Sequence, residues 1–77
     1  MDRAFLEQHL ERAAESVADA ARRVSEQKQR MALLEKRGGD MSGELTRLTH
    51  FEQVYAMFVA NRDRLAQRLE DFGLSYL

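Results

Sequence analysis

Hydrophobic residues recur at alternating spacings of four and three through the first half of the chain. The series contains one glutamine and runs through Leu6, Leu10, Ala13, Val17, Ala20, Val24, Gln27, Met31 and Leu34. Such spacing places all of these side chains on one face of a helix, and its seven-residue repeat is typical of coiled coils. The pattern predicts a long amphipathic helix over about residues 3–37.

A second series with the same spacing occupies the other half of the chain. Its members are Leu48, Phe51, Tyr55, Phe58, Arg62, Leu65, Leu69 and Phe72. It predicts a second amphipathic helix over about residues 41–72. Proline is absent from all 77 residues, and Ala, Leu, Glu, Gln, Arg and Lys dominate, which is a composition that favours long helices.

The segment between the two series carries the signals of a tight turn. Three of the four glycines gather there. Gly38 can take the left-handed conformation that ends a helix, and Asp40 or Ser42 can cap the next one. We therefore expect a turn over residues 38–40 and an all-α fold, an antiparallel coiled-coil-like hairpin that forms a single domain over residues 1–77.

The apolar stripes are wider than a two-helix hairpin can cover. Each helix of a hairpin has only one neighbour, so wide stripes predict dimerisation to a four-helix bundle. A monomer, or a hairpin that docks on a larger protein, remains the alternative. If facing residues have numbers summing to roughly 80, alanines of the first helix lie opposite large residues of the second. The residues that widen the stripes are Ala14, Ala18 and Ala21 in the first helix, and Val54, Met57 and Val59 in the second.

Arg62 stands at a position of the second series where an apolar residue is expected. An unpaired charge on a packed face is costly. We expect Arg62 to form a salt bridge with Asp19 or Glu15 of the first helix and so to fix the register. The alternative is that Arg62 lines a groove for a partner protein.

The charge balance argues against a general attraction to nucleic acid or membrane. The chain has 12 basic and 13 acidic residues and a formal net charge of −1. No apolar run approaches the roughly 18 residues of a membrane span, and acidic residues interrupt any apolar start. Cysteine is absent. We expect a cytoplasmic protein without disulfides.

One concentration of basic residues lies toward the turn end of the first helix. A nucleic-acid-binding regulator that uses this basic face is the alternative function, although such proteins usually carry a denser basic stripe with stacking aromatic residues. A nucleic-acid partner is therefore not the leading expectation. The residues of this face are Arg22, Arg23, Arg30, Lys36 and Arg37.

Catalytic patterns are missing. His9 and His50 are the only histidines, and an antiparallel hairpin separates them. No glycine-rich phosphate loop and no helical pair of metal ligands occurs. The sequence predicts no enzyme, no cofactor and no metal site.

Several short motifs lie along residues 5–69: His9-Leu10, Gln29-Arg30, Leu34-Glu35, Gly38 and Asp40, Phe51-Glu52, and Arg62-Asp63-Arg64-Leu65. These motifs resemble those of a group of small uncharacterised alpha-proteobacterial helical-hairpin proteins. The resemblance implies the hairpin fold and no particular chemistry. Met41 and Gly43 depart from the Thr and Glu that the group often has.

Taken together, these patterns favour a protein-interaction module. The expected partner is a second copy of the chain or a larger, unidentified protein.

Overall fold

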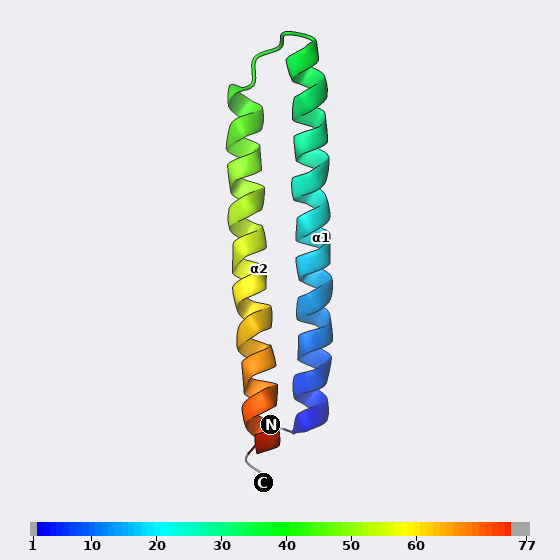
Figure 1. The fold of residues 1–77 in the computed structure, drawn as a ribbon, viewed down its shortest axis with the longest axis vertical. Coiled ribbons are helices and arrows are strands. Elements are labelled where there is room, and N and C mark those ends of the chain that lie inside the picture. Colours follow the sequence, from blue (N-terminus) through cyan, green and yellow to red (C-terminus); the bar gives the residue numbers. More distant parts are fainter. Residues whose placement is uncertain (1, 75–77) are drawn as a thin grey trace.

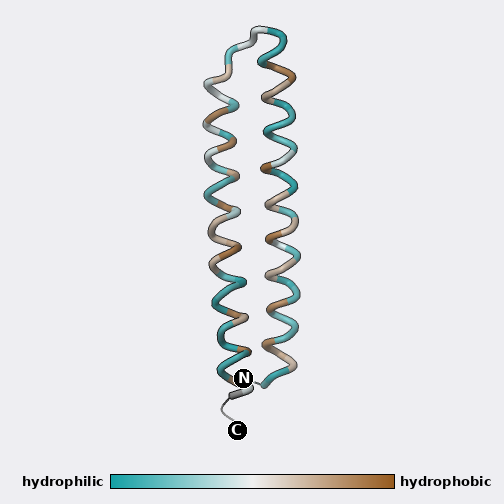
Figure 2. Tube along the Cα trace, in the orientation of Figure 1, coloured by the Kyte–Doolittle hydropathy of each residue, from teal (hydrophilic) through white to brown (hydrophobic). Residues whose placement is uncertain are grey.

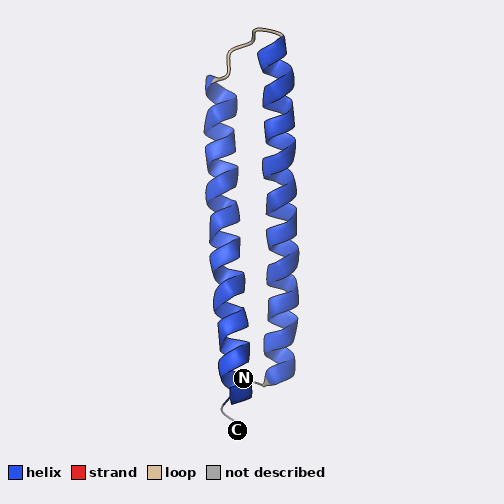
Figure 3. Ribbon diagram, in the orientation of Figure 1, coloured by secondary structure: helices blue, strands red, loops and turns tan. Residues whose placement is uncertain are grey.

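Two long helices lie side by side and antiparallel in the computed structural model, which describes residues 2–74 (Figure 1). Helix α1 spans Arg3–Lys36 and helix α2 spans Ser42–Leu74. The described part of the chain contains no strand (Figure 3). The hairpin is 61 Å long and about 15 Å across, and the start of α1 and the end of α2 lie at the end opposite the turn. The predicted all-α hairpin is confirmed. Its α1 ends one residue before the expected position, and its α2 begins one residue later and runs two residues farther.

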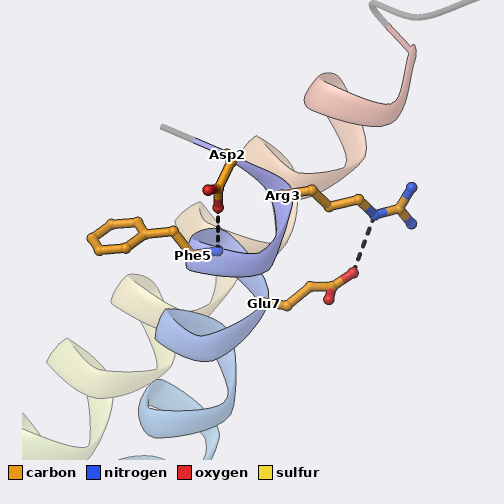
Figure 4. Close-up of polar contacts among 4 residues, drawn as sticks. All are labelled: Asp2, Arg3, Phe5 and Glu7. Atoms are coloured by element: carbon orange, nitrogen blue, oxygen red, sulfur yellow. Dashed lines mark hydrogen bonds and ion pairs between the residues drawn. The ribbon is translucent and has the colours of Figure 1, made fainter.

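Helix α1 begins with a side-chain cap. The carboxylate of Asp2 accepts a hydrogen bond of 2.8 Å from the backbone N–H of Phe5 (Figure 4). This satisfies one of the amides that a helix N-terminus leaves unpaired, and a negative charge there also favours the helix dipole. In the same part of the helix, Arg3 Nε donates to Glu7 Oε1 over 3.1 Å. This exposed pair contributes little to stability.

Two glycines end α1 for two different reasons. Gly38 has a φ of 72°, the left-handed region that glycine adopts without a steric penalty. Its N–H donates to the carbonyl of Glu35, and the N–H of Gly39 donates to that of Leu34. These two bonds form a Schellman motif. A Cβ on Gly39 would overlap the side chain of Leu34, so a larger residue at this position would require Leu34 to shift.

Asp40 prepares the start of α2, as predicted. Its carboxylate accepts a hydrogen bond of 3.0 Å from the backbone N–H of Ser42. The Ser42 amide, and then its hydroxyl, lower the pKa of the exposed Asp40 carboxyl. The N–H of Leu45 donates to the Met41 carbonyl over 2.9 Å. Asp40 thus holds the first amide of the helix, while Ser42 is its first residue.

Burial is concentrated on α1. Apolar residues occur along both helices (Figure 2), and the first heptad series is buried or half-buried at every position. On α2, no residue with a described side chain is buried to the same degree, and most of the second series is half-buried. The core therefore consists of one stripe of α1 covered by larger side chains of α2. Its buried residues are Leu6, Ala13, Val17, Ala20, Gln27 and Met31.

The register between the helices differs from the expected one. Ala20 lines one cavity with Val54, and Gln27 lines another with Arg47, so facing residues have numbers summing to about 74 rather than 80. The loop runs back along the hairpin before α2 begins (Figure 1). Non-helical backbone advances by up to about 3.3 Å per residue, against about 1.5 Å in a helix. A few loop residues therefore displace α2 by more than their number suggests.

Candidate functional site

Gln27 is the polar residue that joins the two helices. Its side chain is only 3% exposed. Its Nε2 donates to the backbone carbonyl of Glu44 over 3.1 Å and also to the Glu44 carboxylate. A polar residue at a heptad core position can fix register, because any slip leaves its buried amide without partners. Gln27 and Glu44 therefore fix the register, the role that the sequence analysis assigned to Arg62.

Arg62 does not form the predicted salt bridge across the hairpin. Its Nε and Nη2 donate to Asp63 on the same helix, at 3.2 and 3.1 Å. Asp19 pairs with Arg22, and Glu15 takes part in no ion pair within residues 2–74. The observed register places Arg62 level with about residue 12, roughly 10 Å along the axis from Asp19. Arg62 is 38% exposed, so its charge stays hydrated beside Asp63.

The predicted basic face is interrupted by acidic residues. Arg22 is held by Asp19, Lys36 lies in the last turn of α1, and Arg37 is its C-cap residue. Arg23 and Arg30 line the cavity described next, and Arg30 also lines a further cavity with Arg37, in which Glu26 and Glu44 take part. Three of the five predicted residues therefore line neighbouring cavities, whereas Arg22 is paired on the helix surface.

Arg23 and Arg30 meet a third arginine from α2. Together with Arg47 they line a cavity of about 150 Å³, in which Gln27 and Phe51 also take part. We call this the arginine groove. Arg47 was absent from the predicted set because nothing in the linear sequence places it beside Arg23 and Arg30. The register of the hairpin brings it there.

A second cavity adjoins the arginine groove and is more apolar. It has a volume of about 180 Å³ and shares Arg23 and Phe51 with the groove. Val54 and Phe58 add apolar surface, and His50 is one of the polar residues around it. The two cavities place a cationic end and an aromatic end side by side.

A different surface is formed where Ala21 and Tyr55 line a third cavity. Ala14 and Ala18 precede Ala21 at helical spacing, on the same face of α1, and are exposed. Tyr55 is 37% exposed. We call these four residues the alanine face. Small residues at this spacing leave room for another helix to approach closely.

Other chemistry finds little support in the described residues. His9 packs its ring against that of Phe5, with centroids 4.3 Å apart. Residues 2–74 contain no group of three or more His, Asp and Glu side chains placed to hold a metal ion. No helix among these residues is both long and apolar enough to cross a membrane.

Comparison with known proteins gives no relative. The chain matches no protein-family model, no curated protein and no solved structure. The resemblance to small alpha-proteobacterial hairpin proteins therefore stays a prediction, and the functional argument rests on the geometry of this chain alone.

Proposed function

We propose that this chain is a non-enzymatic protein-interaction module that pairs with a second copy of itself to form a four-helix bundle. The observation that carries the proposal is its surface area. The chain exposes 5962 Å². A compact folded monomer of 8.9 kDa exposes about 4,800 Å². The excess of roughly 1,200 Å² exceeds the approximately 800 Å² that each partner buries in a standard interface.

The half-covered second helix supports the same proposal. Its seam side chains keep part of their surface in solvent, and Tyr55 is 37% exposed. A further pair of helices would cover this surface and gain about 25 cal/mol for each Å² of apolar area removed from water. The gain matters for a chain of this size, because one small core supplies only about 3–5 kcal/mol.

The alanine face is the proposed contact between the copies. Ala14, Ala18 and Ala21 extend the apolar surface of α1 beyond its buried stripe, and Tyr55 adds an aromatic ring from α2. Small and large residues on one face allow two identical hairpins to interdigitate about a two-fold axis. The predicted cytoplasmic location is part of the same proposal.

Sedimentation equilibrium tests the proposed dimer over about 1 to 200 µM protein. We expect a mass that rises with concentration toward twice 8.9 kDa, and a melting temperature that rises with it. Ala21→Glu should shift the equilibrium to the monomer, because it places a charge in the interface. Ala60→Glu is the matched control, since Ala60 is exposed on α2 and lies outside the alanine face.

A stable monomer throughout this concentration range would overturn the dimer. Docking of the single hairpin on a larger protein would then become the leading alternative. Equal loss of dimer in Ala21→Glu and Ala60→Glu would instead place the interface elsewhere on the hairpin.

A further inference from the structure

Three arginines line the arginine groove, and none of them has an ion-pair or hydrogen-bond partner within residues 2–74. The ion pairs of residues 2–74 involve other arginines, and no hydrogen bond is made by the side chains of Arg23, Arg30 or Arg47. Glu26 is the one acidic residue among those that line the cavity. Arg23 and Arg30 are two helical turns apart on α1, and Arg47 faces the position between them. With Glu26 and the Glu44 carboxylate that Gln27 binds counted, three arginines stand against two carboxylates, so the groove keeps a net positive charge.

Guanidinium groups in such an arrangement suit a phosphate. Arginine presents planar, fixed pairs of N–H donors that match two phosphate oxygens at once, and these charge-assisted hydrogen bonds are stronger than neutral ones. Among the residues that line the groove, Gln27 is buried, and its amide is held by Glu44. Arg23, Arg30 and Arg47 are exposed, so their guanidinium groups are open to a ligand from solvent.

The adjoining cavity supplies an apolar surface beside this cationic end. Phe51 contributes to both cavities, and Val54 and Phe58 extend the apolar wall. Ser16 and His50 border it with groups that can form hydrogen bonds. The two adjoining volumes together reach the lower end of the range for small-molecule sites, which is about 300 Å³.

We propose that this composite groove binds a nucleotide. The phosphate lies among Arg23, Arg30 and Arg47, and the base packs on Phe51 and Phe58, since every base offers a π-face to an aromatic ring. The proposal is independent of dimerisation, because the groove lies between the helices on residues that the alanine face does not include.

The groove favours a single nucleotide over a nucleic-acid strand. Asp19 and Glu26 line the two cavities and interrupt the run of positive charge. A strand needs a longer basic track to bind several successive phosphates. Arg22, which would prolong the basic surface, is already paired with Asp19.

Calorimetric titration of the full chain with adenosine 5′-monophosphate tests the proposal. Adenosine and inorganic phosphate serve as the two half-ligands. We expect the nucleotide to bind at least about tenfold more tightly than either, because only the nucleotide engages both ends of the groove. Arg47→Gln and Arg30→Gln should each weaken its binding by about tenfold, the typical effect of removing one charged hydrogen-bond partner. Arg12→Gln is the matched control, because Arg12 is exposed on α1 and lies outside both cavities.

Circular dichroism and sedimentation of each variant show whether a loss of binding is due to loss of folding or of dimerisation. Binding lost in Arg47→Gln while helicity and mass are unchanged supports the site. Undetectable binding of the nucleotide at about 5 mM overturns the proposal, as does equal affinity for inorganic phosphate. Binding of a single-stranded oligonucleotide without binding of the mononucleotide overturns it in favour of a nucleic-acid surface.

Discussion

The two helices have the same pattern and nearly the same length, yet they are buried to different degrees. Helix α1 has 34 residues, six of which are buried, whereas none of the described side chains of the 33-residue α2 reaches that level. Alanines in the seam of α1 accept the large side chains of α2: Ala20 shares a cavity with Phe51 and Phe58. A small residue such as Ala20 is covered completely by these neighbours, whereas Phe51 and Phe58 extend past the seam and keep part of their surface in water. Residue size explains this part of the difference, but the large Leu6, Gln27 and Met31 of α1 are buried as well.

Each series places one polar residue in the seam, and these two residues also differ in burial. Gln27 on α1 is buried and bonded to Glu44 across the hairpin. Arg62 on α2 is half-exposed and bonded to its neighbour Asp63. A buried amide must find a partner in the protein, whereas a long arginine side chain can keep its charge in water at the edge of the seam. Only the first of the two residues fixes the register.

Truncation of one large residue on each helix should give the largest effect of the difference in burial between α1 and α2. Met31→Ala on α1 removes a buried side chain, and we expect a loss of about 2–4 kcal/mol in the free energy of unfolding. Leu48→Ala on the half-buried side of α2 should cost about 1 kcal/mol, because part of Leu48 is already in water. Urea denaturation at low micromolar protein measures both values.

The same pair of variants also tests the proposed dimer. If a second copy covers α2, the cost of Leu48→Ala should increase at high protein concentration, while that of Met31→Ala changes less. Equal costs for the two truncations at low concentration would show that burial in solution does not differ between the helices.

Substitution of Gln27 should have an intermediate effect. Gln27→Ala removes both bonds to Glu44 and leaves a cavity, at a cost of about 1–3 kcal/mol. Gln27→Leu restores the apolar seam and should recover most of that stability while loosening the register. Thermal unfolding measures the first effect, and distances between spin labels on the two helices measure the second. Gln53→Ala, at an exposed position of α2, is the control and should change neither. A Gln27→Leu protein with a single, unchanged register would mean that apolar packing alone aligns the helices.

Substitution of Arg62 should have the smallest effect. Its partner is the adjacent Asp63, and both side chains are substantially exposed, so Arg62→Ala should change the free energy of unfolding by about 0–1 kcal/mol. A double-mutant cycle between Arg62→Ala and Asp19→Ala should give no coupling beyond about 0.5 kcal/mol, the limit of additivity for separate sites. A larger coupling energy would restore the salt bridge that the sequence predicts and would contradict the observed register.

The candidate sites were only partly accessible from the sequence. The arginines of α1 could be identified as a basic concentration, but the contribution of Arg47 depends on which turn of α2 faces Gln27. The N-cap of Asp2 had a local signal, since aspartate before a helical series is a preferred cap. The adjoining cavity had no local signal in the sequence, because Ser16, His50 and Phe58 come together only through packing.

The sequence by itself determined the two helices and their reversal. Heptad spacing depends on neighbours three and four residues away, and the left-handed Gly38 depends on a single residue type, so both are local properties of the chain. Only the tertiary structure decided the register, and with it the bond of Gln27 to Glu44, the separation of Arg62 from Asp19 and the meeting of three arginines around one groove. A heptad repeat permits several alignments of two helices. The path of the loop and the need to pair a buried amide select one of them.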